Sequence, residues 1–308
     1  ADCYRSGERN TKAISFYNKL IDKNPYNPSY WTGLAKCHFS QQEFDKAVEA
    51  CDFALAADDK FGEAHIIRAH SLFHLENETE AIQEYQLALQ SKSLPPDFAH
   101  MFIGLAYANQ EKWELAYRSY EQAMKIIGDD NSPILSDIYS NEIFCLSKLG
   151  RYEEAHQLCE KAKKQLPESV EIYLQEGRLY LEEDKFEEAK QCWAVALQYA
   201  PEAETLVQIG NYSLDYGMVE NARLCFEEAK KQDPDYPGIN GRLASICMIL
   251  RDHKGFQKYN QMSETPLNIE MIQEMLSQNT DKDILQNLET FMNELDDVND
   301  GETEEENN

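Results

Sequence analysis

The sequence predicts an all-α solenoid, a stack of helical hairpins in which each hairpin contacts only its neighbours. The first observation is an alanine that recurs every 33 to 39 residues along most of the chain. The second observation is that other residue types recur at fixed distances from these alanines. A large side chain follows most of them by four positions, and a small residue precedes most of them by twelve. A period of this length is typical of a repeat architecture. The recurring alanines are Ala13, Ala47, Ala81, Ala116, Ala155, Ala189 and Ala222.

The clearest copy of the pattern runs from Gly177 to Pro201. It begins with a small residue and continues through Phe186, beside a predicted turn, to Trp193 in a second apolar run. We expect the small residues where two helices touch and the large ones in the gaps between them. Pro201 is expected to end the second helix because proline has no N–H to donate and restricts the residue before it.

These copies resemble the tetratricopeptide repeat family over about residues 1–236, and a decayed copy extends the match to about 262. The resemblance implies a right-handed α-α superhelix of seven to eight hairpins, with a concave groove lined by the first helix of each hairpin. It also implies a protein partner more often than catalysis. Ile143 departs from the pattern in the small-residue slot. Departures in the aromatic slot of the first helix are His38, Leu72, Leu146 and Ser213.

The start of the chain fits the repeat only in part. Ala1 and Tyr4 match slots of a first helix and Ala13 matches the second, so an incomplete first hairpin is predicted. We interpret this as a piece of a longer protein, with a naturally short capping helix as the alternative. Later repeats are predicted to begin near Pro28, Gly62, Asp97, Ser136, Val170 and Ala203. The polar insertion 128–133 is either a spacer or a recognition loop.

Three segments are predicted: a solenoid over 1–262, capping helices over 263–295 and a disordered acidic tail over 296–308. Phe256 replaces the alanine of the last repeat, and Pro266 breaks the chain after it. Apolar residues at helical spacing then predict helices near 269–278 and 283–295. These helices are expected to cap the solenoid, or alternatively to bind a partner or a second copy of the chain.

The composition limits the classes of partner. The chain has 29 basic and 56 acidic residues and a formal charge of −27, which argues against nucleic acid and anionic membrane surfaces. No apolar run reaches the roughly 20 residues of a membrane span. The eight cysteines form no C-x-x-C pair, and several occupy apolar slots of the repeat. Buried free thiols indicate a reducing compartment, so a cytoplasmic location is expected.

No motif for catalysis is found. The phosphate-binding, dinucleotide and H-E-x-x-H patterns are absent from the sequence. His70 and His74 are four residues apart on one helix face, but zinc needs three or four ligands. We therefore predict no enzyme activity, no cofactor and no metal.

The predicted function is a non-catalytic interaction scaffold that binds a partner helix or an extended peptide in the groove. The alternative is the regulatory or substrate-docking region of a larger enzyme or signalling protein. Family members that grip acidic chaperone tails place Lys, Asn and Arg in the groove, and here only Lys36, Arg178 and Asn211 match. The middle repeats are mostly apolar, so we expect a partner with an apolar centre and a basic rim. The candidate partner-binding residues are Lys36, Ile66, His70, Phe73, Phe98, Met101, Phe102, Leu105, Phe144, Arg178 and Asn211.

Overall fold

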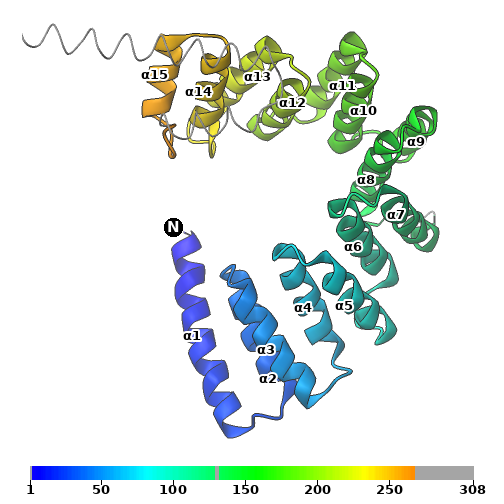
Figure 1. Cartoon of the computed structure of the whole chain (residues 1–308), viewed down its shortest axis with the longest axis vertical. Helices are drawn as coiled ribbons and strands as arrows, with labels where there is room; N and C mark the ends of the chain where they lie inside the picture. Colours follow the sequence, from blue (N-terminus) through cyan, green and yellow to red (C-terminus); the bar gives the residue numbers. More distant parts are fainter. Residues whose placement is uncertain (1, 129–131, 268–308) are drawn as a thin grey trace, which may run out of the picture. The chain divides into compact units, whose positions relative to one another are not determined.

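The computed structural model describes residues 2–128 and 132–267, and within these ranges the chain forms fifteen α-helices and no strand (Figure 1). The all-α prediction is confirmed. A long helix, α1 (Asp2–Lys23), precedes seven hairpins. The first helices of the hairpins are α2 (Pro28–Ser40), α4 (Gly62–His74), α6 (Pro96–Asn109), α8 (Leu135–Lys148), α10 (Val170–Glu182), α12 (Ala203–Asp215) and α14 (Ile239–Ile249). The second helices are α3 (Phe44–Ala57), α5 (Glu78–Gln90), α7 (Trp113–Ile127), α9 (Tyr152–Gln165), α11 (Phe186–Tyr199), α13 (Val219–Gln232) and α15 (His253–Gln261).

The chain divides after Pro167 into two compact units, which we call unit 1 (α1–α9) and unit 2 (α10–α15). Within each unit a second helix packs on the first helix of its own hairpin and on the first helix of the next. Successive first helices also contact each other in the pairs α2–α4, α6–α8 and α10–α12. The first helices therefore form a shared face in each unit, as the solenoid prediction requires.

Each hairpin is held by a large side chain that fits against a small residue. A Cβ atom on Gly177 would lie 2.2 Å from the indole nitrogen of Trp193, and one on Gly210 would lie 2.4 Å from the ring of Phe226. Both rings are buried. The hairpin with Ile143 in the small-residue slot has Cys159 in the large-residue slot, and both are buried. Exchanging the large and the small residue keeps the volume of the pair close to that of the other hairpins, so this departure leaves the packing intact.

The turn inside each hairpin has the same backbone conformation. One residue has φ between 56° and 71°, in the left-handed region, and only two of the seven are glycine. These residues are Gln42, Glu76, Glu111, Gly150, Asp184, Gly217 and Arg251. The next N–H then donates to the carbonyl five residues earlier, as from Asn77 to Leu72 at 2.9 Å. This bond is the mark of a Schellman motif, which ends the first helix and satisfies its last carbonyl groups.

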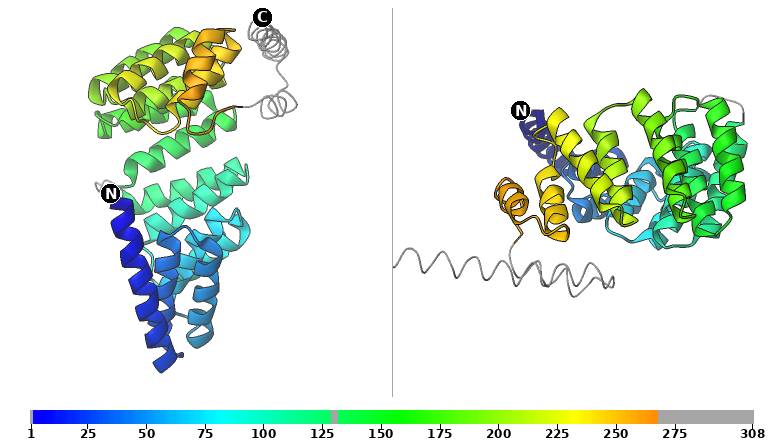
Figure 2. Two further views of the ribbon diagram at one scale, coloured as in Figure 1. Left: turned by 90° about the vertical axis from the view of Figure 1, so that its left-hand side faces the viewer. Right: turned by 90° about the horizontal axis from the view of Figure 1, so that it is seen from above.

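The incomplete first hairpin that the sequence predicts, with a turn before Ala13, is not observed. Residues Asp2–Lys23 form one uninterrupted helix, which lies beside α2 (Figure 2). A turn like the others would need a left-handed residue near Glu8, at a cost of about 1 kcal/mol for a side chain other than glycine.

The decayed last repeat forms the hairpin α14–α15, and Phe256 is buried in place of the expected alanine. The short segment after it is tied down by Asn260, whose side-chain amide pairs with both the N–H and the carbonyl of Leu267, at 2.7 and 3.0 Å. The predicted capping helices near 269–278 and 283–295 and the acidic tail 296–308 lie outside the described residues, as do residues 129–131 of the insertion.

None of the described helices combines the length and the apolarity that a membrane span requires.

Candidate partner-binding site

The first helices of unit 1 carry a connected set of rings. We call this set, Phe39, His70, Phe73, His74 and Phe102, the aromatic face. The ring centroids of His70 and Phe102 lie 4.7 Å apart, and those of Phe39 and His74 lie 5.6 Å apart. Phe73 meets His74 edge-on at 6.1 Å. These ring contacts run from α2 to α4 and from α4 to α6, so they connect three successive hairpins.

Two rings from second helices support the aromatic face from behind. Phe44 stacks on His74 with a centroid distance of 4.5 Å and an angle of 8° between the planes. Tyr85 is buried and stacks on Phe102 at 5.3 Å. Rings that already pack against other rings lose little further freedom when a ligand binds, so the face is preorganised.

Burial keeps His70 uncharged. Its Nδ1 and the hydroxyl of Tyr85 are hydrogen-bonded at 2.8 Å. Burial, and then the neighbouring His74, lower the pKa of His70 to about 4. At neutral pH this ring is therefore a polar but uncharged part of the face. The rings of His70 and His74 are occupied by aromatic contacts, and the residues that the structure describes contain no cluster of three or more metal-binding side chains.

The predicted residues of unit 1 differ in how far they reach the surface. Most are half-buried, and several pack on the core cluster of the hairpins α4–α5 and α6–α7. Met101 is wrongly predicted as a contact residue, because only 7% of its surface is exposed. Lys36 is exposed, and its Nζ lies 2.5 Å from a carboxylate oxygen of Glu63. The half-buried members are Ile66, His70, Phe73, Phe98, Phe102, Leu105 and Phe144.

Phe144 lies on α8, outside the three first helices that carry the aromatic face. Its ring meets that of Trp113 edge-on at 5.4 Å, and Nζ of Lys148 lies 5.5 Å from its centroid. A cation over a ring is a favourable arrangement. These two contacts are with α7 and with α8 itself, so they extend the apolar surface of unit 1 toward a fourth hairpin.

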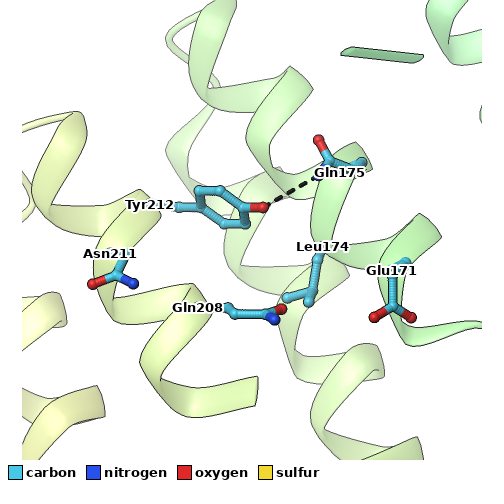
Figure 3. A pocket seen from close by; sticks show the side chains of 6 residues that line it. All are labelled: Glu171, Leu174, Gln175, Gln208, Asn211 and Tyr212. Atoms are coloured by element: carbon cyan, nitrogen blue, oxygen red, sulfur yellow. Dashed lines mark hydrogen bonds between the residues drawn. The ribbon is translucent and has the colours of Figure 1, made fainter. Parts of the chain in front are cut away.

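Unit 2 has a different, polar site on its first helices. A pocket of about 250 Å³ lies between α10 and α12 (Figure 3). Its lining consists of Glu171, Leu174, Gln175, Gln208, Asn211 and Tyr212. Asn211 is the one predicted residue in this lining, and Arg178 lies beside it with its guanidinium carbon 5.6 Å from the centre of the Tyr212 ring. The first helices thus carry aromatic side chains in unit 1 and amide side chains in unit 2.

Several residues of these sites were not among the candidates predicted from the sequence. Phe39 and His74 belong to the aromatic face, and Phe44 and Tyr85 support it. In unit 2 the pocket uses Gln175 and other polar side chains that carry no motif. The available signal was periodic: Phe39 and Phe73 share a slot of the repeat, and His74 follows His70 by one helical turn.

The fold defines a class, the solenoid of helical hairpins. Two family models described as tetratricopeptide repeat match residues 99–134 and 146–208. A third, described as anaphase-promoting complex, cyclosome, subunit 3, matches residues 7–88. The chain thus contains tetratricopeptide repeats, over residues 99–134 and 146–208.

Individual relatives are distant. Anaphase-promoting complex subunit 7 of Dictyostelium discoideum is 23% identical over 250 residues, which cover 79% of this chain and 41% of the relative. DnaJ homolog subfamily C member 7 of Homo sapiens is 22% identical over 261 residues, which cover 79% of this chain and 53% of the relative. The chain thus spans about half the length of these curated relatives.

Solved structures support the same fold. Yeast Tom70 superposes with a TM-score of 0.63 at 17% identity, covering 92% of this chain and 58% of that one. A tetratricopeptide repeat protein from Parabacteroides merdae gives a TM-score of 0.60 at 19% identity, covering 76% of this chain and 91% of that one. At these identities the likeness shows the fold alone.

Proposed function

We propose that the chain is a non-catalytic interaction scaffold and that the aromatic face of unit 1 binds an apolar segment of a protein partner. The observation that carries the proposal is the run of ring contacts from Phe39 to Phe102 across three first helices. These rings are half-buried or exposed, and rings of second helices support them from behind. Rigid, partly exposed aromatic side chains are the usual anchors of protein interfaces.

The charge of the chain supports a partner with a basic rim. The formal charge is −27, so a basic rim on the partner would be attracted from a distance. Lys36 on α2 already pairs with Glu63 on α4, which offsets its positive charge. We expect the association rate to fall as salt is added, because screening weakens this steering.

The relatives point in the same direction. One of them is by name a subunit of the anaphase-promoting complex, and another is a DnaJ homolog. By analogy, we propose that the chain helps to assemble other proteins. We also propose that it acts in the cytoplasm. The alternative, a regulatory or substrate-docking region of a larger enzyme or signalling protein, makes the same prediction for the aromatic face.

The test begins with a partner captured by affinity purification and identified by mass spectrometry, then measured with the purified chain by calorimetry. Phe73→Asp places a charge on the aromatic face. Loss of an aromatic anchor costs about 2 kcal/mol or more, so we expect binding to weaken by roughly 30-fold or more. Phe102 is a poorer choice, because it stacks on Tyr85 and supports the hairpin packing.

The matched control is Leu87→Asp on α5. Leu87 is 40% exposed and lies on the second helix of the same hairpin as Phe73. The control should bind like the parent chain, and the thermal melting of both variants shows whether each is folded. If Leu87→Asp abolishes binding while Phe73→Asp does not, the partner uses the second helices and the proposal is wrong.

A further inference from the structure

The pocket of unit 2 is lined by side chains that both donate and accept hydrogen bonds. Gln175 lies on α10 and Tyr212 and Asn211 lie on α12, and their side chains surround one space (Figure 3). None of the six lining residues is basic, and Glu171 adds one carboxylate. The pocket is therefore unsuited to an anion, because an anion would meet Glu171 without a paired cation in the lining.

Existing hydrogen bonds fix the direction of each polar group. Nε2 of Gln175 donates to the hydroxyl oxygen of Tyr212 at 3.2 Å, which leaves the amide oxygen of Gln175 and the hydroxyl proton of Tyr212 available. Oδ1 of Asn211 accepts from Nε of Arg242 at 3.4 Å, so the NH2 group of Asn211 is left to donate. Nε2 of Gln208 donates to Glu204 at 3.3 Å, which leaves its amide oxygen as an acceptor.

The ring of Tyr212 is held in place from both sides. It stacks on Trp193 with centroids 6.5 Å apart, and the guanidinium of Arg178 lies over it. Burial raises the pKa of Tyr212, so its hydroxyl remains a donor at neutral pH. The donors and acceptors of the pocket are thus positioned before any ligand arrives.

We infer that this pocket binds an uncharged amide group of a protein partner, either a main-chain peptide group or the side chain of glutamine or asparagine. An amide offers an N–H donor and a carbonyl acceptor together. The lining offers both kinds of partner, since the Tyr212 hydroxyl and the Asn211 NH2 group can donate and the amide oxygens of Gln175 and Gln208 can accept. A carboxylate only accepts and an ammonium only donates, so either would match only one of the two kinds of group in this half-buried lining. The inference rests on the proposed function as an interaction scaffold and gives unit 2 its own specificity.

The test needs no partner protein, so its outcome is independent of the aromatic face. The full chain, labelled with ¹⁵N, is titrated with three small probes, and the side-chain amide signals of Gln175, Gln208 and Asn211 are followed by NMR. The probes are N-acetylglutamine N′-methylamide, the corresponding glutamate compound and the corresponding glycine compound. We expect the glutamine probe to shift these signals. If its side chain supplies the amide, it should bind at least tenfold more tightly than the glutamate probe, which has the same main-chain amides. A glycine probe that binds equally identifies the main chain as the source of the amide, and weaker binding identifies the side chain.

Variants connect the signal to the pocket. Asn211→Asp replaces a donor by an acceptor and should abolish the response, while the new carboxylate can still pair with Arg242 and keep the fold. Asn109→Asp, at an exposed position of α6, makes the same chemical change elsewhere and should leave the response unchanged. Tighter binding of the glutamate probe than of the glutamine probe overturns the inference, as does the absence of any shift with the parent chain.

Discussion

Glu142 on α8 is a buried carboxyl group whose charge the fold does not neutralise. Its surface is 4% exposed. Burial, and then repulsion from Glu121, raise the pKa of Glu142 to about 8, while Lys161 and Lys125 oppose the rise. Glu84, also buried, differs because its oxygens lie 2.8 Å from Arg68 and 2.6 Å from His65. We therefore expect Glu142 to weaken unit 1 at neutral pH.

The size of the effect follows from the pKa. The folded-state value lies above the ordinary 4.5, so the group contributes stability below pH 4.5 that is lost as the pH rises toward 8. At about 1.36 kcal/mol per pH unit, the loss at pH 7 is about 3 kcal/mol. Glu142→Gln removes the ionisation and should stabilise the chain by that amount at pH 7. The gain should be smaller at pH 5.5 and larger at pH 8.

The assay is equilibrium urea unfolding of both proteins at pH 5.5, 7 and 8, followed by circular dichroism. Glu153→Gln, at an exposed position of α9, removes the same charge from the surface and is the control. Its effect should be within about 0.5 kcal/mol and independent of pH. A gain for Glu142→Gln that is equal at pH 5.5 and 8, or a loss at pH 8, would refute the reasoning. It would show that Glu142 is ionised in the folded chain and is stabilised by the nearby lysines.

Three further predictions concern packing, turns and thiols. Gly177→Ala should lower stability by about 1 kcal/mol, because overpacking against Trp193 exceeds the gain in helix propensity, and thermal melting measures it. Glu111→Gly should raise the melting temperature by relieving roughly 1 kcal/mol of left-handed strain at φ 56°, and a lower value would contradict this. Burial raises the pKa of Cys51 to about 12, so Ellman's reagent should label half-buried Cys192 before it, as mass spectrometry of the products would show.

The hairpins could be predicted from the sequence because each one solves the same packing problem. A glycine at 104, 177 or 210 leaves room for one large ring, and this pair recurs at a fixed distance in the chain. Ile143 and Cys159 meet the same need with sizes reversed. The repeat pattern thus follows from the space between the two helices of each hairpin, and the residue types show which side chains fit that space.

The candidate site could be predicted only in part, because the same slot differs in exposure from one hairpin to the next. Met101 occupies a first-helix slot that faces the groove in the family, yet it is buried, whereas Ile66 in the same slot is half-buried. The pocket of unit 2 depends on which amide atoms are already bonded, as for Gln175 and Tyr212. Such contacts follow from neighbouring side chains that have no fixed relation to the repeat.

The tyrosines at 85 and 120 differ in whether their buried hydroxyl groups are hydrogen-bonded. They occupy equivalent positions, and both are buried. The hydroxyl of Tyr85 is hydrogen-bonded to His70, whereas that of Tyr120 has no hydrogen-bond partner in the part of the chain that the structure describes. Leu105 occupies the slot that corresponds to His70, so a histidine there would supply the missing bond.

An unpaired buried hydroxyl costs about 1–3 kcal/mol, so Leu105→His is expected to raise the melting temperature. If the groove contacts an apolar partner at this slot, the same change should weaken binding, because an imidazole must lose water to enter an apolar interface. Stability and binding would then move in opposite directions in one variant. A more stable variant with unchanged affinity would remove position 105 from the binding surface and would confine the partner to the aromatic face around Phe73.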